Sequence, residues 1–455
     1  MEASAAARLP PHTLMQRAGL AVAKFAMAVA PHAKVFWIPS GPGNNGGDGY
    51  EAATHLKSWG KSPIVTCLSG LSRPPPDAAV SLRQAMEAGV EFSDTAPDHY
   101  DLCIDALFGV GRLRPADGLY ATWIHRINTR SAPVLAVDTP SGLDADTGLA
   151  AALHVKADYT LSLLTLKPGL FTADGREACG EIWLNTLGID PPTVACARLS
   201  RRPIAKSRAH NSHKGSYGDV CIVGGNPGMA GAALLAARAA IRSGAGRVFV
   251  SMMDNRSIQL DASQPELMFR DLSEVNLGMM TIVAGCGGGL GIQALLPKLL
   301  AQSARLVLDA DALNAIAIDP SLQSALAARP ANTTVLTPHP LEAARLVSTT
   351  TAEVQANRLV TAQAIADRFA CVVALKGSGT LIAAPGALPY INTTGNGRLA
   401  TAGTGDVLAG MIGARFSAAA DAFLITCDSA FHHGEVADKW PDTLTLSAQD
   451  LTRAL

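Results

Sequence analysis

Short apolar runs alternate with segments of helical periodicity along the first half of the chain. The runs predict five buried strands, at Lys34–Ser40, Ser62–Leu68, Asp101–Leu107, Pro133–Asp138 and Asp158–Leu164. Continuous apolar runs of this length fit strands that are covered on both faces of a parallel sheet. Helices are expected over Ala18–Ala30, which is amphipathic, and over Asp48–Trp59. The alternation therefore predicts a doubly wound α/β sheet, with ligands bound at the carboxyl ends of its strands.

The same alternation restarts in the second half, after prolines and basic residues interrupt it between Asp190 and Ser212. Six strands are predicted there, at Asp219–Gly225, Arg247–Met252, Thr281–Gly285, Arg305–Asp311, Thr333–Pro338 and Cys371–Gly377. The predicted helices are Met229–Arg242, Leu399–Ala414 and Ala420–Asp438. The interruption predicts a boundary between two α/β domains, residues 1–200 and residues 210–455.

Composition and charge narrow the class of protein. Hydrophobic residues make up 48% of the chain and aromatic residues only 5%, which favours helices on parallel strands over a β-sandwich. The 37 basic and 38 acidic residues are mixed, unlike the charge pattern of a nucleic-acid binder. The basic cluster Arg201, Arg202, Lys206 and Arg208 is interpreted as a solvated linker.

The apolar runs, the N-terminus and the cysteines of the sequence indicate the compartment of the protein. No apolar run reaches the roughly 18 residues of a membrane span, and the N-terminus lacks the pattern of a secretory signal. The eight cysteines occur singly, with none in a CxxC pair. They indicate buried, reduced thiols in a cytoplasmic protein.

Glycines and polar residues gather in three loops that follow predicted strands of the first domain. The first loop, SGPGNNGGDGYEAA, opens a helix, whose N–H groups and dipole suit a phosphate. Ile104–Arg112 carries Asp105 at a strand end, and Ala136–Gly148 carries Asp138 and Ser141 at another. Each of these residues alone is more often a turn or cap residue. Three such loops in one domain favour a polar site in one crevice.

The motifs GPGNNGGDG, DALFGVG and VDTPSGLDADTG, with KPGL at Lys167–Leu170, resemble the NAD(P)HX epimerase family over Met15–Ile189. The resemblance to this YjeF N-terminal type implies a Rossmann-like fold, the hydrated nucleotides NADHX and NADPHX as substrates, and one potassium ion. It implies that Asp138 is the acid/base at nicotinamide C6, where proton transfer assists bond breaking and remaking.

The same resemblance implies two sets of binding residues. The implied potassium ligands, directly or through neighbouring carbonyls, are Asn45, Asp105 and Ser141, whose oxygens suit a hard cation. The implied substrate-binding residues are Asn44, Asn45, Gly46, Gly47, Asp48, Gly109, Val110, Gly111, Arg112 and Asp138. The stretch before Leu14 is short for the family, so we expect either absent leading structure or an internal start codon.

The segment NTTGNGRLATAGTGDVLAG, Asn392–Gly410, is the most informative in the second domain. Its GTGD precedes a helical pattern, so the N–H groups form an anion cradle with Asp406 beside it. A carboxylate there can act as base toward a substrate hydroxyl. The alternative, a helix N-cap, is disfavoured by the flanking GN, ATAG and DVLAG. Lys376 lies near a strand end before a glycine turn, and His339 lies on a loop between two prolines.

Together these segments resemble the ADP/ATP-dependent NAD(P)H-hydrate dehydratase family over Lys214–Asp438, which implies a ribokinase-like fold. The implied chemistry is phosphoryl transfer from ADP to the C6 hydroxyl, with AMP and phosphate released and magnesium as counter-ion. The implied nucleotide-binding residues are Lys376, Gly377, Ser378, Gly379, Thr380 and Gly405. The implied substrate contacts are Ala232, Gly289, His339 and the catalytic Asp406.

Three loops depart from the pattern of that family. The usual PHPGE reads PHPLE, with Leu341 in place of glycine, the GPGLG-like loop reads GCGGGLG, and the GNPGMA-like stretch reads GNGRLA. None of these changes removes a charged catalytic candidate. They affect the fine geometry of the loops.

The leading hypothesis is a bifunctional repair enzyme, in which an epimerase interconverts the R and S hydrates and a dehydratase consumes the S form. The alternative enzyme is a small-molecule kinase of the ribokinase superfamily, which GTGD fits equally. A third reading treats the first domain as a non-catalytic binding module, against which Asn45, Asp105 and Asp138 argue. The preferences for ADP or ATP and for NADHX or NADPHX stay open. We expect a homo-oligomer without nucleic-acid or membrane partners, and the alanine-rich helices suit core and subunit contacts equally.

Overall fold

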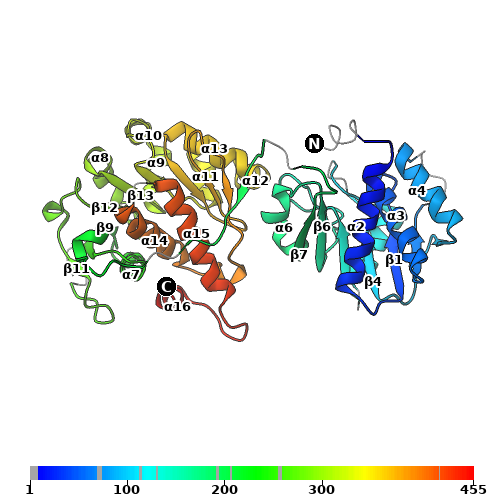
Figure 1. The fold of residues 1–455 in the computed structure, drawn as a ribbon. Coiled ribbons are helices and arrows are strands. Elements are labelled where there is room, and N and C mark those ends of the chain that lie inside the picture. Colours follow the sequence, from blue (N-terminus) through cyan, green and yellow to red (C-terminus); the bar gives the residue numbers. More distant parts are fainter. Residues whose placement is uncertain are drawn as a thin grey trace. The chain divides into compact units, whose positions relative to one another are not determined.

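The computed structural model describes residues 9–68, 74–111, 115–129, 132–190, 194–204, 207–254, 259–419 and 421–455. The chain divides into two compact units, Met1–Val194 and Ala195–Leu455, and each unit has its own sheet (Figure 1). The α/β class that the sequence predicts for both halves is confirmed.

The first unit contains a seven-stranded parallel sheet in the order β3-β2-β1-β4-β5-β6-β7. Its strands are β1 (Val35–Pro39), β2 (Ser62–Thr66), β3 (Glu91–Ser93), β4 (Leu102–Asp105), β5 (Val134–Val137), β6 (Tyr159–Leu163) and β7 (Glu181–Asn185). All five predicted strands are present. The strand order reverses between β1 and β4, so the loops after these two strands flank the crevice where such sheets bind ligands.

Helices cover both faces of this sheet (Figure 1). They are α2 (Thr13–Val29), α3 (Asn44–Ser58), α4 (Pro76–Glu87), α5 (Gly118–Asn128), α6 (Gly175–Ala178) and the 3₁₀ turn η1 (Pro168–Phe171). Apolar side chains of α2, α3 and α4 pack on one face, and those of α5 pack on the other. The predicted helix Asp48–Trp59 begins instead at Asn44, because tertiary contacts outweigh the low helix propensity of its Asn and Gly residues.

The second unit contains a ten-stranded sheet in the order β11-β10-β9-β12-β13-β14-β15-β16-β17-β8. Its strands are β8 (Arg198–Leu199), β9 (Asp219–Gly224), β10 (Arg247–Met252), β11 (Met268–Phe269), β12 (Thr281–Ala284), β13 (Arg305–Leu308), β14 (Thr334–Leu336), β15 (Val372–Leu375), β16 (Leu381–Ala383) and β17 (Tyr390–Ile391). The strands from β11 to β15 are parallel, and β16 pairs antiparallel with both of its neighbours. All six predicted strands are present.

The segment between Asp190 and Ser212, where the sequence predicts the domain boundary, contributes strand β8 to this second unit, and β8 pairs with β17. The basic cluster follows this strand. Its residues Arg201, Arg202 and Arg208 are exposed, in agreement with the predicted solvated cluster, and Arg202 forms an ion pair with Glu435 of α15.

The helices of the second unit are α7 (Ala230–Arg242), α8 (Ile292–Gln302), α9 (Asp311–Ile318), α10 (Pro320–Ala327), α11 (Pro340–Val347), α12 (Thr351–Ala356), α13 (Arg358–Phe369), α14 (Thr404–Ala418), α15 (Ala422–Asp438) and α16 (Ala448–Arg453). Three 3₁₀ turns, η2 (Lys214–Tyr217), η3 (Leu272–Glu274) and η4 (Gly397–Leu399), complete the set. One face of the sheet packs against α7, α14 and α15, while α8, α9, α11 and α13 lie on the other side (Figure 1). The helix predicted from Leu399 begins at Thr404, because Gly403 has φ +91° and ends the preceding turn.

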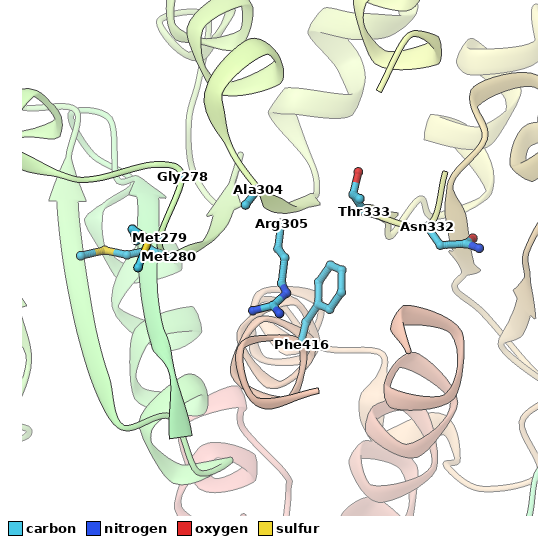
Figure 2. Close-up of a pocket in the computed structure, with 8 residues that line it drawn as sticks. All are labelled: Gly278, Met279, Met280, Ala304, Arg305, Asn332, Thr333 and Phe416. Carbon is cyan, nitrogen blue, oxygen red and sulfur yellow. The ribbon is translucent and has the colours of Figure 1, made fainter. Parts of the chain in front are cut away.

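A cavity of about 460 Å³ lies where β12, β13 and β14 begin. Figure 2 shows its lining, which consists of Gly278, Met279, Met280, Ala304, Arg305, Asn332, Thr333 and Phe416. The residues singled out by the sequence lie instead after the strands, at the opposite edge of the sheet. Among the helices of the described ranges, none combines the length and the apolar character needed to cross a membrane.

Candidate functional site

Asp105 and Ser141 form the buried core of a polar cluster in the first unit. The carboxylate of Asp105, at the end of β4, accepts hydrogen bonds from the Ser141 N–H at 2.8 Å and the Ser141 hydroxyl at 2.6 Å. Both side chains are fully buried. Burial raises the pKa of Asp105 to about 6, although the bonds from Ser141 oppose this shift. A cation placed beside this carboxyl group would favour its ionised form.

Asn45 lies against the loop that follows Asp105. A Cβ atom added to Gly109 would lie only 2.9 Å from Asn45 Oδ1, so the backbone passes directly over this amide. The Nδ2 atom of Asn45 is buried and has no hydrogen-bond partner within the described parts of the chain. A Cβ atom on Gly41 would lie 1.7 Å from the carbonyl oxygen of Leu107, so only glycine allows the two loops to meet. We call Asn45, Asp105, Asp138 and Ser141 the first centre.

Asp138 is held separately from the Asp105 pair, immediately after β5. Its backbone has φ +68°, a left-handed conformation that is uncommon for residues other than glycine. Its Oδ1 atom accepts the N–H of Leu163 at 2.9 Å and forms an ion pair with the ammonium group of Lys167. Lys167 also donates to the carbonyl oxygen of Leu163 at 2.8 Å. Lys167 has no role in the sequence prediction, although the KPGL motif contains it.

The other residues predicted for the first centre fall on two segments. Asn44, Gly46, Gly47 and Asp48 form the first turn of α3, next to Asn45. Gly109 contacts Asn45 as described, whereas Val110 is exposed. Arg112 lies outside the described residues.

Asp406 stands at the start of α14, as its third residue. The helix cap is Gly403, so Asp406 is not the N-cap residue that the alternative interpretation requires. The side-chain ligand atoms of Cys286, Asp309 and Asp406 all lie within 4.8 Å of one another. Burial, and then the charge of Asp309, raise the pKa of Asp406 to about 6. Burial and the Asp406 carboxylate raise the pKa of Cys286 well above its ordinary value, so this group remains a thiol.

Lys376 provides the positive charge of this second cluster. Its Nζ atom lies 2.7 Å from Asp309 Oδ1, and Asp309 also accepts the hydroxyl of Thr337 at 2.8 Å. Burial lowers the pKa of Lys376, but the carboxylates of Asp309 and Glu342 outweigh burial and raise it. A Cβ atom on Gly405 would lie 3.2 Å from this Nζ atom, so the ammonium group touches the first turn of α14. We call Cys286, Asp309, Lys376 and Asp406 the second centre.

His339 is not a free loop residue, because it caps α11. Its Nδ1 atom accepts the N–H groups of Leu341 at 3.1 Å and Glu342 at 3.3 Å, and Glu342 accepts the His339 N–H at 2.7 Å. This capping box leaves Nε2 on the other side of the ring, 3.2 Å from Glu342 Oε1. Burial raises the pKa of Glu342 to about 7 and lowers that of His339.

Ala232 lies in the first turn of α7, which follows β9, and Gly289 lies in the loop after β12, where the strand order of the sheet reverses. A Cβ atom on Gly287 would lie 3.0 Å from the Ala232 Cβ, so this loop contacts the first turn of α7. The Gly289 N–H donates to Asp311 at 2.7 Å.

Five residues that the site prediction omits lie in or beside these clusters: Lys167, Cys286, Asp309, Thr337 and Glu342. Asp309 has a clear sequence signal, since the strand VLDADALN ends in carboxylates. Glu342 has one as well, because it stands three residues after the helix cap His339, as in a capping box. Thr337 has none, because a threonine after a strand is common.

Comparison with known proteins divides the chain in the same way. A family model described as NAD(P)H-hydrate dehydratase matches residues 220–455, and one described as YjeF-related protein N-terminus matches residues 11–169. The bifunctional NAD(P)H-hydrate repair enzyme Nnr of Escherichia coli is 36% identical over 94% of this chain and 85% of its own length. The enzyme of the same name from Moorella thermoacetica is 34% identical over 96% of this chain and 89% of its own.

A solved structure is also similar to part of this chain. The ADP/ATP-dependent NAD(P)H-hydrate dehydratase of Bacillus subtilis, co-crystallised with ATP and Mg²⁺, is 30% identical, with a TM-score of 0.48. The match covers 55% of this chain and 91% of that one.

Proposed function

This chain belongs to the family of bifunctional NAD(P)H-hydrate repair enzymes, and we propose that its first centre epimerises the hydrate while its second centre dehydrates it. The chain is therefore an isomerase and a lyase that act on one damaged metabolite. An epimerase supplies the configuration at C6 that the dehydratase consumes, so one chain clears both the R and the S hydrates.

In the first centre, Asp138 is the proposed acid/base. The Leu163 N–H and the Lys167 ammonium group fix its carboxylate at the end of β5. Inversion at C6 requires a bond of the hemiaminal-like carbon to break and to form again on the other face. A fixed carboxylate can accept and return the proton that this exchange moves. We assign Lys167 to holding this carboxylate in position.

Asn45, Asp105 and Ser141 are the proposed ligands of a potassium ion. The Oδ1 atom of Asn45 lies against the loop at Gly109, and the carboxyl group of Asp105 is buried beside Ser141. Both side chains supply oxygen atoms suited to a hard cation. Potassium, when bound, would supply the positive charge that ionised Asp105 lacks in its surroundings.

The hydrated nucleotide is proposed to lie along the first turn of α3 and the loop at residues 109–112. Asn44, Asn45, Gly46, Gly47 and Asp48 form the helix N-terminus. The N–H groups of the first three precede the first intrahelical bond, which Gly47 donates to Gly43, and such N–H groups favour a phosphate. Gly109, Val110, Gly111 and Arg112 complete the proposed binding loop.

In the second centre, Asp406 is the proposed base. As the C6 hydroxyl attacks the β-phosphorus of ADP, Asp406 takes its proton, the new O–P bond forms, and the bond to AMP breaks. The C6–O bond then breaks with phosphate as the leaving group, while C5 loses a proton and the C5–C6 double bond is restored. A pKa of about 6 suits a base that must be ionised near neutral pH and must accept a proton during attack.

The nucleotide is proposed to bind at the turn Lys376–Thr380 and at Gly405, where a helix N-terminus and a lysine meet. The carboxylate oxygens of Asp309 suit magnesium, which when bound would neutralise phosphate charge. Ala232, Gly289 and His339 are proposed substrate contacts. The expected homo-oligomer and the compartment stay predictions.

The observation that carries the dehydratase assignment is Asp406 in the first turn of α14, with Lys376 of the Asp309 pair touching the same turn. The test incubates the full chain with NADHX and either ADP or ATP, and follows the recovery of NADH absorbance. We expect recovery that requires a nucleotide and releases AMP and phosphate when ADP is used. A phosphorylated product that accumulates without any NADH would instead indicate a small-molecule kinase.

A further inference from the structure

Arg358 is a buried cation at a place that ordinary helix chemistry disfavours. It is the first residue of α13 and is 2% exposed. A positive side chain at a helix N-terminus opposes the helix dipole, and burial of its charge adds a desolvation cost. Burial lowers the pKa of Arg358 to about 10, which still leaves it charged at neutral pH. Side chains that break local rules in this way concentrate at functional sites.

The contacts of Arg358 converge on one turn. Its Nη2 atom donates to the carbonyl oxygens of Leu375 at 3.3 Å, Lys376 at 3.2 Å and Gly379 at 3.3 Å. Its Nη1 atom donates to Gln355 Oε1 at 2.7 Å, which holds the guanidinium group from the other side. The turn that accepts these hydrogen bonds is the proposed nucleotide-binding turn, Lys376–Thr380.

These bonds fix the direction of the N–H groups of the turn. In a trans peptide unit the C=O and N–H bonds point in opposite directions. The carbonyls of Lys376 and Gly379 point at Arg358, so the N–H groups of Gly377 and Thr380 point away from it. Gly377 has φ +127°, and a Cβ atom there would lie 2.9 Å from Arg358 Nη1, so the turn lies directly against the guanidinium group.

We propose that Arg358 is a positioning residue for the nucleotide. By drawing carbonyl oxygens to one side of the turn, it presents the N–H groups of Gly377 and Thr380, beside Lys376, to the phosphates. The inference rests on the proposed dehydratase function and deepens it, because it names a residue that acts through the turn without touching the nucleotide. Its effect therefore belongs to nucleotide binding rather than to the proton transfer at Asp406.

The test compares Arg358→Lys with the matched control Arg329→Lys in the full chain. Arg329 is also buried and also donates to backbone, at Ser303 O (2.9 Å), but it contacts Thr334 at the beginning of β14. Lysine keeps the charge at residue 358 but lacks the planar fork that reaches several carbonyls. We expect the KM for ADP to rise about tenfold in Arg358→Lys, with kcat within about threefold of the wild type.

Four further readouts separate positioning from folding. The Kd for ADP with magnesium, measured by calorimetry without hydrate, should rise in parallel with the KM. The KM for NADHX and the epimerase activity of the same chain should stay unchanged. Arg358→Met, which donates nothing to the carbonyls, should raise the KM for ADP further than Arg358→Lys does.

Two results would overturn the proposal. One is an unchanged KM for ADP in Arg358→Lys. The other is a loss in which the KM values for both substrates and the unfolding temperature change together, as a structural role predicts. Failure of the proposed function would give a different result, because the wild-type chain itself would then show no nucleotide-dependent recovery of NADH.

Discussion

Each centre lies after the carboxyl ends of strands in its own sheet, but the two centres balance the charge of their carboxylates in opposite ways. In the first centre, Lys167 pairs with the proposed acid/base, Asp138, while Asp105 is satisfied by neutral donors. In the second centre, Lys376 pairs with Asp309, and the proposed base Asp406 is left beside that carboxylate. The same elements, a lysine and two aspartates, thus give a fixed, ion-paired acid/base in one unit and a carboxylate of raised pKa in the other.

The difference follows from what each reaction must bind. An epimerase moves a proton and returns it, so its carboxylate must above all keep a fixed direction. A phosphoryl transfer brings several negative charges to the site, so a lysine that is already paired must be shared with them. The Asp309–Lys376 pair at the start of α14 suits this exchange, because the helix N-terminus adds positive potential.

The largest expected effect separates the centres through Asp406. We expect Asp406→Asn to lower the dehydratase kcat by about a thousandfold or more, because asparagine cannot accept the hydroxyl proton. The epimerase of the same chain should be unaffected. NADH absorbance measures the first activity, and chromatographic separation of the R and S hydrates measures the second.

The control for this variant is Asp450→Asn. Asp450 is likewise the third residue of its helix, α16, but its contacts are with Ser447, the cap of that helix, and with Arg453 of the same helix. Its replacement should leave the dehydratase active. Substantial dehydratase activity in Asp406→Asn would remove Asp406 from the role of base.

The reciprocal change is Asp138→Asn, for which we expect a loss of epimerase activity of about a hundredfold to ten-thousandfold. Lys167 would then face a neutral amide, so both the proton acceptor and its orientation are lost. Dehydration of the S hydrate should continue at its wild-type rate. Asp146→Asn, an exposed change in the same loop, is the control. Full interconversion of the hydrates by Asp138→Asn would show that the acid/base is another group.

The sequence predicts several residues of both centres, but it does not predict which of these residues contact one another. Asp105, Asp138 and Asp406 are predictable because a buried parallel strand or a helix start marks each position with a recognisable pattern. The Lys376–Asp309 pair joins residues of two strands far apart in the chain, and no local pattern reports that distance. Arg358 stands in an ordinary helical segment of the sequence, so only the folded structure shows which carbonyl groups it contacts.

The shortest strands of the second sheet show the same limit. Strands β8, β11, β16 and β17 are two or three residues long, so they carry no apolar run that a periodicity can detect. Their positions depend on pairing with strands already formed. For the same reason the sequence predicts only an interruption between Asp190 and Ser212, although β8 lies there.

A smaller expected effect is the pH dependence of the dehydratase. Because burial and Asp309 raise the pKa of Asp406 to about 6, its basic form is lost as the pH falls below that value. The kcat/KM for NADHX should therefore be about tenfold lower at pH 5 than on the plateau above pH 7. Rates measured in buffers of constant ionic strength check this. A profile that stays flat down to pH 5 would contradict the raised pKa or the role of Asp406.

The smallest expected effect is a change in thermal stability, which tests the charge balance of the first centre without an activity assay. The pKa of Asp105 is raised to about 6, so above that pH the folded unit holds a buried negative charge that the unfolded chain would expose to water. This charge lowers stability as the pH rises through 6, and a cation that binds beside it offsets the loss. We therefore expect KCl to raise the Tm of the first unit by about 2–4 °C over an equal concentration of NaCl at pH 8, and by less at pH 5.

Scanning calorimetry measures this transition, and Asp105→Asn should abolish the difference between the salts. Identical curves in the two salts, or a potassium effect that survives in Asp105→Asn, would mean that Asp105 is not a ligand. The first centre would then keep its buried carboxyl group neutral through hydrogen bonds alone.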